Sequence, residues 1–311
     1  RFFHSWVFRG PFGIPLPGVM GSCAALSVHL LASIFTRLKG RSLGLWLTHL
    51  GLLAMMAGAF FTRRFARETV VVLAEGERTA VSVSETAWEL AVIRPLPDGS
   101  REVTAHAWDR LSSGARIALP GEPSELAIER VYRSVDTSRL PRRPEPGDLQ
   151  PAPMPSDPRR ALPAAVVRVG GERVALIGEG EALALGPPVG TDPASVYVQL
   201  RRARYPLPFA IRLLDFEKAF HPNTQIPRSF RSRVEVIEDG QAREVIISMN
   251  RPLLRGAFAL YQSSYMDAPD GREVSVLAVS ENRFRPAPYL ATALMAFGMV
   301  AHYLRPRRRD A

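Results

Sequence analysis

Three long apolar stretches without Asp, Glu, Lys or Arg constrain the fold of this chain more than any other feature of its sequence. They cover residues 17–36, 43–61 and 287–304. A transmembrane helix needs about 20 mostly apolar residues to cross a hydrocarbon core of about 30 Å. Helices of this length in soluble proteins usually carry charges on one face. We therefore expect three transmembrane α-helices in a multi-pass membrane protein.

The basic loop between the first two stretches sets the predicted topology. Residues 37–42 hold two arginines and a lysine and leave room only for a tight antiparallel helix hairpin. Because the chain changes sides at each span, this loop and the basic tail 305–311 lie on one side of the membrane. Segments 1–16 and 62–286 lie on the other. The positive-inside rule makes the loop side cytoplasmic, and three arginines after the second stretch oppose it only weakly, because long domains cross largely regardless of charge. We expect a bacterial inner membrane protein with its large domain on the periplasmic side, in contact with membrane lipid.

The net charge and the cysteine content exclude two classes of function. The formal net charge of +10 comes mostly from arginines that are spread over strand-like segments and membrane flanks. A nucleic-acid site would instead gather them in a compact basic helix or patch with aromatic residues between them, so we expect no nucleic-acid partner. The single cysteine, Cys23, excludes an internal disulfide and a CxxC motif.

The segment between the second and third stretches has the pattern of an antiparallel β-sheet. Short β-branched or alternating runs are separated by turn dipeptides such as Asp239-Gly240 and Gly170-Gly171. No long amphipathic helical pattern interrupts them. We expect a large extracytoplasmic all-β domain, an antiparallel sandwich or barrel. The predicted strands include residues 70–73, 88–93, 126–131, 165–169, 196–200, 234–237, 245–247 and 274–279.

Residues 138–163 differ from the rest of this domain. They are rich in proline, arginine and acidic residues and contain few large apolar side chains. Such a composition buries too little surface to offset the entropy of ordering the chain. We expect a long mobile loop or a linker between two lobes of the β domain.

Histidines lie within all three apolar stretches, at positions 29, 49 and 302. Ionisable residues inside a membrane are costly and usually mark function. With a rise of about 1.5 Å per residue, His29 and His49 lie about 10 Å and 9 Å from the basic-loop ends of their helices. Imidazoles on facing helices are a common way to hold haem iron. We expect His49 and His29 to be axial ligands of a b-type haem; alternatively, each imidazole forms hydrogen bonds to a neighbouring helix, and His302 is a solvated residue at the interface.

Small residues follow His49 along the second stretch. Gly51 and Gly58, with Ala54, Ala57 and Ala59 between and after them, give this helix one smooth face. A smooth face lets another helix or a flat macrocycle approach closely. The sequence does not distinguish these two occupants.

Two segments, Asn250-Arg-Pro-Leu253 and Tyr261-Gln-Ser-Ser264, and several others resemble the ResB (CcsB) family of System II cytochrome c biogenesis proteins. The order of two spans, an extracytoplasmic β domain and a final span is also that of the family. The most specific segments are Asn250-Arg-Pro-Leu253 and Tyr261-Gln-Ser-Ser264. The other segments that carry the resemblance are Phe3-His4-Ser5-Trp6-Val7-Phe8, Thr48-His49-Leu50-Gly51-Leu52, Ala57-Gly58-Ala59, Leu213-Leu-Asp-Phe216, His221-Pro222, Ser229-Phe-Arg-Ser232 and Gly256 through Tyr265.

The resemblance implies a role in haem delivery. A ResB protein works with a ResC (CcsA)-type membrane partner to move haem across the membrane and present it to apocytochrome c, as a non-catalytic component of the haem lyase complex at most. The family's transmembrane haem is associated with a histidine that matches His49, whereas His29 and His302 match no family position. The family usually has one more N-terminal span and a longer β domain. These departures leave open a haem b electron-transfer subunit of a membrane oxidoreductase, or a structural anchor without cofactor.

Other chemistry finds little support in the sequence. No glycine-rich phosphate loop, HExxH motif or nucleophile elbow is present. Asp215 and Glu217 alternate on a predicted strand and therefore share one sheet face with basic neighbours. We expect that face to be a solvated surface, and we expect hydrogen bonds at a strand end for Gln262, Ser263 and Ser264.

Overall fold

The computed structural model of the chain forms two compact units. One unit comprises Arg1–Glu68, Leu253–Leu260 and Ser280–Ala311, and the other comprises Thr69–Pro252 and Tyr261–Val279. The predicted basic loop and basic tail lie outside the described residues. The structure describes residues 6–9, 13–36, 43–120, 125–136, 138, 140–141, 144–169, 171–180, 183–185, 196–222, 224, 227–267 and 271–304.

The first unit contains three helices, α1 (Val19–Thr36), α2 (Leu43–Phe65) and α3 (Ala287–Tyr303). Helices α1 and α2 are long and apolar enough to cross a membrane, and most of their residues are not buried within the chain. This confirms the expected membrane protein with apolar N-terminal helices. Helix α3 has 17 residues, slightly fewer than the roughly 20 that span a bilayer. Its membrane crossing and the sidedness of the β domain stay predictions.

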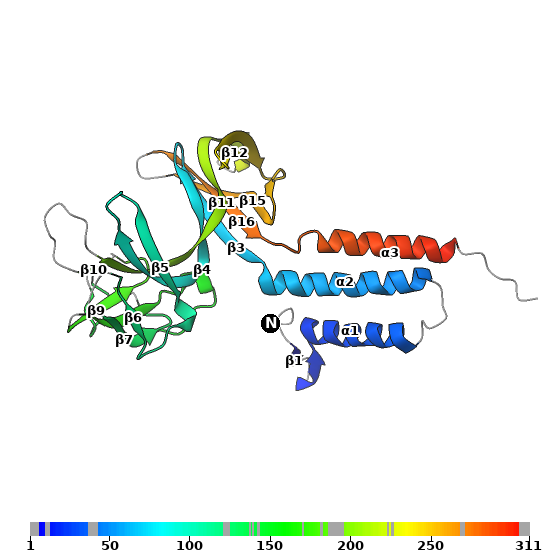
Figure 1. Cartoon of the computed structure of the whole chain (residues 1–311), viewed down its shortest axis with the longest axis horizontal. Coiled ribbons are helices and arrows are strands. Elements are labelled where there is room, and N and C mark those ends of the chain that lie inside the picture. The colour runs from blue at the N-terminus through cyan, green and yellow to red at the C-terminus, as the bar shows by residue number, and fades with distance from the viewer. Residues whose placement is uncertain are drawn as a thin grey trace, which may run out of the picture. The chain divides into compact units, whose positions relative to one another are not determined.

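Helix α2 lies between α1 and α3 (Figure 1) and packs far more extensively against α3. The contact uses Gly44, Gly51 and Gly58, which are buried and recur every seven residues. A Cβ atom on Gly44 would lie 2.4 Å from the backbone nitrogen of His302, and one on Gly298 would lie 2.6 Å from the backbone nitrogen of Thr48. The smooth face of α2 is therefore occupied by a helix, and the expected tight pairing of the first two stretches is the weaker of the two contacts.

Ten strands form one sheet, in which the order along the main path is β13-β12-β11-β4-β3-β16-β15-β14, while β5 pairs with β4 and β10 with β11. Their bounds are β3 (Arg67–Ala74), β4 (Arg78–Pro95), β5 (Arg101–Ala107), β10 (Leu183–Leu185), β11 (Val196–Phe220), β12 (Pro227–Glu238), β13 (Gln241–Ser248), β14 (Leu253–Arg255), β15 (Phe258–Asp267) and β16 (Glu273–Glu281). The pairs with a described register are antiparallel. The sheet confirms the predicted antiparallel β domain.

A second sheet of four antiparallel strands has the order β6-β7-β8-β9. These are β6 (Arg116–Ala118), β7 (Glu125–Tyr132), β8 (Ala164–Val169) and β9 (Glu172–Ile177). Their apolar residues form one core with residues of β4 and β11, including Leu90, Leu126, Val167, Val198 and Leu200, each at most 1% exposed. A two-stranded ribbon of β1 (Val7–Arg9) and β2 (Pro15–Pro17) and the 3₁₀ helices η3 (Trp108–Arg110) and η4 (Pro158–Arg160) complete the fold.

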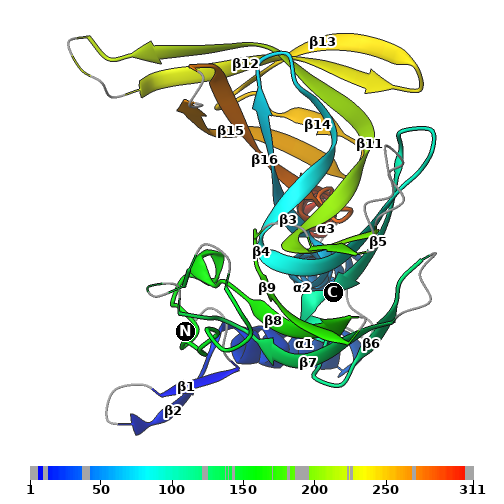
Figure 2. The same cartoon turned by 90° about the vertical axis from the view of Figure 1, so that its left-hand side faces the viewer.

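The predicted turn at Asp239-Gly240 joins β12 to β13 in a long hairpin, drawn in yellow shades in Figure 2. Glu238 pairs with Gln241, so the turn has two residues. Both residues have positive φ, 51° and 77°. This conformation matches a type I′ turn, whose twist suits the flanking strands.

A buried ion pair joins β4 to β11. The Arg201 Nε atom lies 2.9 Å from Glu89 Oε1, and the side chains are only 10% and 7% exposed. The other carboxylate oxygen of Glu89 accepts a hydrogen bond from the backbone nitrogen of Arg204 at 3.2 Å. Burial is the main cause that lowers the pKa of the Arg204 guanidinium, followed by the nearby charge of Arg201. Both oxygens of the Glu89 carboxylate are thus bound by residues of β11.

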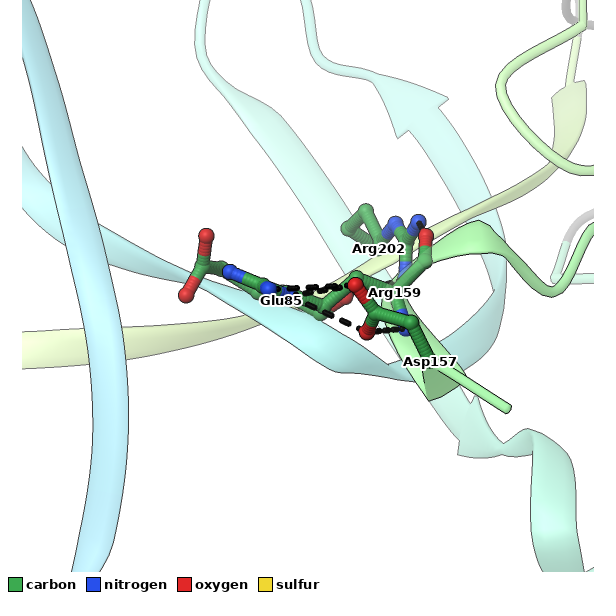
Figure 3. A network of polar contacts seen from close by, with 4 residues as sticks. All are labelled: Glu85, Asp157, Arg159 and Arg202. Atoms are coloured by element: carbon green, nitrogen blue, oxygen red, sulfur yellow. Dashed lines mark hydrogen bonds and ion pairs between the residues drawn. The ribbon is translucent and has the colours of Figure 1, made fainter. Parts of the chain in front are cut away.

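The proline-rich segment is anchored to the β domain by Arg202 of β11. The Arg202 guanidinium lies 4.0 Å from the centre of the Trp88 ring, and its Nη2 atom donates to the carbonyl oxygen of Arg159 at 2.6 Å. Figure 3 shows Arg159 between Arg202 and Asp157. The Arg159 side chain donates to the Asp157 carboxylate and lowers its pKa. Leu149 of the same segment is also buried. Two described residues of this segment, Leu149 and Arg159, thus contact the β domain.

Candidate functional site

His49 is a half-buried residue of α2. Its Nδ1 atom lies 2.8 Å from the carbonyl oxygen of Leu45, one turn earlier in the helix. A carbonyl oxygen only accepts hydrogen bonds, so we assign the proton of a neutral ring to Nδ1. The lone pair is then on Nε2. Histidines that bind metals commonly donate their other ring N–H to a backbone carbonyl in this way, so the hydrogen bond of His49 is compatible with a metal ligand at Nε2.

The position of His49 around α2 is fixed by its neighbours. At 3.6 residues per turn, it lies about 200° from Gly51 and therefore points away from α3. Met56, seven residues later, shares the His49 face. The Met56 Sδ atom lies 3.8 Å from the Ser27 Oγ atom of α1. His49 therefore faces the α1 side of α2.

His29 is exposed on α1. The side of α1 that meets α2 includes Ser27 and the buried residues Leu30 and Ile34. His29 lies two residues from Ser27, about 200° around the helix, and so projects from the opposite side. Within this chain, His29 and His49 project toward different surroundings.

The contact between Ser27 and Met56 also sets the helix register. His29 lies two residues from Ser27, and His49 lies seven residues from Met56, both toward the 37–42 end. At about 1.5 Å per residue, their depths differ by about 7 Å. The register therefore separates two imidazoles that the sequence placed at nearly equal depths.

The positions of the three histidines fit a haem site with one axial ligand from this chain better than a site with two. His49 offers one nitrogen with its tautomer fixed, whereas His29 faces away from α2. His302 lies in the last turn of α3, where its backbone approaches Gly44 of α2. Its ring makes an edge contact with the Tyr303 ring. Over the described ranges, no group of three or more His, Cys, Asp or Glu side chains forms a metal cluster.

A buried polar network lies in the β domain. The Ser232 Oγ atom of β12 donates to Gln262 Oε1 of β15 at 2.6 Å and lies 2.7 Å from Ser275 Oγ of β16. Gln262 Nε2 donates to Ser275 Oγ at 3.1 Å and to the carbonyl oxygen of Ser264 at 3.2 Å. Ser232 and Ser275 are fully buried and Gln262 is 7% exposed. Gln262 was predicted to form a hydrogen bond at a strand end. Its side chain instead belongs to a buried network that joins β12, β15 and β16.

An aromatic cluster lies in the same strands. The Tyr265 ring of β15 lies 5.8 Å from the rings of Phe216 on β11 and Phe230 on β12. The Lys218 Nζ atom lies 4.9 Å from the Tyr265 ring centre and 2.9 Å from Glu273 Oε1. The polar network and this cluster bring together the segments Leu213–Phe216, Ser229–Ser232 and Tyr261–Tyr265, although they lie far apart in the sequence. Sequence reasoning missed Ser275; its signal was a serine at a buried position of an alternating run.

These strands lie in the part of the chain that matches a family model. Residues 188–272 match the model described as the ResB-like family. This part of the chain is similar to the ResB-like family. The match extends from β11 to β15 and does not reach the helices that carry His29 and His49.

A curated relative supports the same assignment. Protein NrfI of Wolinella succinogenes is 30% identical to this chain over 106 residues. The matched segment is 33% of this chain and 11% of the relative. The chain therefore spans about a tenth of the length of the curated relative that it matches.

Proposed function

We propose that this chain takes part in cytochrome c maturation, in which it moves haem across the bacterial inner membrane and delivers it to apocytochrome c together with a ResC/CcsA-type membrane partner. The supporting observation is a ResB-like β domain in a chain whose apolar helix α2 presents His49 with a fixed tautomer. The domain acts on the periplasmic side, and α3 serves as the third span.

In this proposal His49 supplies one axial nitrogen to a b-type haem. The hydrogen bond from Nδ1 to the Leu45 carbonyl oxygen keeps Nε2 available and limits rotation of the ring. The second ligand comes from the partner, because His29 projects from the far side of α1. His29 then binds a haem or contacts a partner protein at the exposed face of α1. A haem that shares its ligands between two proteins can be released by their separation, which suits delivery.

The β domain supplies the rigid part of the machinery. The Ser232–Gln262–Ser275 network is fully hydrogen-bonded and buried, and such networks fix one arrangement of the strands around them. We propose that the domain positions the partner and the apocytochrome, and that it carries no catalytic residue of its own.

A haem b electron-transfer subunit is the second candidate function. A redox subunit would hold its haem permanently between two of its own ligands. The different faces and depths of His29 and His49 disfavour that arrangement within one chain. A structural anchor without cofactor is the third candidate, and it predicts no change on substitution of His49.

The test is a maturation assay in cells that lack the native gene. Covalently bound haem in c-type cytochromes is measured after complementation with the wild-type chain, His49→Ala, His29→Ala and, as a control on α3, His302→Ala. We expect His49→Ala to lower matured cytochrome c at least about tenfold, as loss of a ligand contact does, and His302→Ala to change it little. Normal maturation without the chain would reject the proposed function, whereas normal maturation with His49→Ala would reject the ligand assignment.

A further inference from the structure

Strand β13 forms an open edge of the large sheet. It ends the strand order, and within the described strands it pairs only with β12. Open edges present unpaired N–H and C=O groups and are usually protected by charged side chains. The first half of β13 has this protection from Arg243 and Glu244, but residues 245–248 carry no charge. Ile246 is 53% exposed, and Met249 just beyond the strand is 51% exposed.

The outer face beside this edge carries rows of paired charges. In one row, Arg231 lies between Glu217 and Ser248, and its Nε atom is 2.8 Å from Glu217 Oε2. In the next row, Arg233 lies between Asp215 and Ile246 and is 3.6 Å from Asp215 Oδ2. This confirms the solvated face predicted for Asp215 and Glu217. The arginines of these rows already have acidic partners.

Arg251 lies at the end of these rows, and among the described residues it has no acidic partner. It follows β13 in a tight turn, where the backbone groups of Ser248 and Arg251 exchange hydrogen bonds of 3.2 Å and 3.1 Å. Its side chain is exposed, and no ion pair joins it to the residues that the structure describes. It borders a hollow of about 430 Å³ whose lining also includes Ser229, Ile246 and Ser248. The hollow therefore combines an unmatched positive charge with an exposed apolar side chain.

We propose that residues 245–248 form a docking edge for an extended segment of a partner protein, with an acidic side chain of that segment bound by Arg251. The added strand would pair with the free backbone groups of β13, as in β-strand addition. A side chain opposite Ile246 would cover it, as cross-strand neighbours do. The carboxylate of the bound segment would form an ion pair with Arg251, as Glu217 does with Arg231 and Asp215 with Arg233.

This inference is independent of the haem proposal, because it rests only on the edge, its apolar half and Arg251. The partner's chemistry follows from these features. An extended segment satisfies the open backbone groups, β-branched residues suit the uncharged half, and acidic residues suit Arg251. A second copy of this chain that pairs edge to edge is the competing occupant, and the test separates the two.

The test uses the full chain in detergent micelles and a fluorescein-labelled five-residue peptide that alternates valine and glutamate. We expect saturable binding by fluorescence anisotropy. Ile246→Glu, which places a negative charge on the open edge, and Arg251→Glu should each weaken binding about tenfold or more, because each repels the glutamates of the peptide. The matched controls Ala242→Glu and Arg243→Glu lie on the same strand, away from the hollow, and should leave affinity within about twofold.

A charge exchange completes the test. Arg251→Glu should regain binding when the glutamates of the peptide are replaced by lysines, while the wild-type chain should not bind that peptide well. Thermal unfolding of each variant confirms that it is folded. Three results would overturn the proposal: no saturable binding to the wild-type chain, equal losses in the control variants, or a concentration-dependent dimer that Ile246→Glu abolishes while peptide binding is unchanged.

Discussion

The Nδ1 atom of His49 and the carbonyl oxygen of Leu45 are 2.8 Å apart within α2. This contact ties an imidazole to the helix backbone and directs its second nitrogen away from the helix axis. Because His49 lies on the side of α2 opposite the glycines that meet α3, helix packing leaves the ring unobstructed by α3. The same helix thus separates two tasks, close packing on one face and a nitrogen donor on the other.

The glycine face of α2 predicts a strong response to added volume. Gly44→Leu would place a Cβ atom 2.4 Å from the His302 backbone nitrogen, where no flexible side chain can move aside. Overpacking of this kind costs about 1–3 kcal/mol. Thermal unfolding in detergent should show a lower midpoint for Gly44→Leu than for Ala54→Leu, because Ala54 is exposed. Equal midpoints would show that α3 does not pack on Gly44.

The buried network predicts a loss of stability when one member is removed. Ser232→Ala takes away the hydroxyl that donates to Gln262 Oε1, and a buried acceptor left without a partner costs about 1–3 kcal/mol. Urea unfolding of the full chain should show this loss, whereas Ser263→Ala, at an exposed position of β15, should change stability by less than about 0.5 kcal/mol. A Ser232→Ala variant as stable as the wild-type chain would contradict the network.

Arg202 predicts the behaviour of the proline-rich segment. Its guanidinium stacks on Trp88, binds the carbonyl oxygen of Arg159 and pairs with Glu179 at 3.1 Å. Lysine keeps the charge but lacks the planar fork. Arg202→Lys should therefore speed proteolytic cleavage and hydrogen exchange within residues 144–163, while Arg173→Lys on exposed β9 should not. Unchanged exchange in this segment would show that it is held elsewhere.

Glu129 predicts an acid dependence of stability. Hydrogen bonds from Arg168 and Arg173 lower the pKa of the Glu129 carboxyl below its ordinary value. A lowered folded-state pKa means that the stabilisation is present above the unfolded-state value and is lost as the pH falls through the folded-state value. Unfolding midpoints of the wild-type chain should fall more steeply below about pH 4.5 than those of Glu129→Gln. Parallel curves would exclude this contribution.

The sequence predicted the elements better than their partners. Periodicity located the strands of the β domain and the turn at Asp239-Gly240, because alternation and positive-φ residues are local signals. The pairing of α2 with α3 depends on Gly298, about 250 residues from Gly44, and no local pattern reveals it. The short loop 37–42 predicted a tight hairpin of α1 and α2 because the two helices are adjacent in the sequence. Helix α2 nevertheless packs more extensively against α3 than against α1.

The candidate site was predictable only in part. The apolar surroundings of His49 and His29 are visible in the sequence, but their directions depend on the Ser27–Met56 contact between two helices. The role of Ser275 depends on strands that meet only in the folded domain. The contact between Arg202 and the Arg159 carbonyl oxygen likewise joins residues that no local pattern connects.

The most direct test of the account is the absorption spectrum of the chain purified from membranes with its partner complex. The wild-type preparation should show the bands of a b-type haem. His49→Gly should lose most of this haem and regain it when imidazole is added to the growth medium and buffers, while His302→Gly should keep it. Full haem content in His49→Gly without imidazole would contradict the assignment of His49 as an axial ligand.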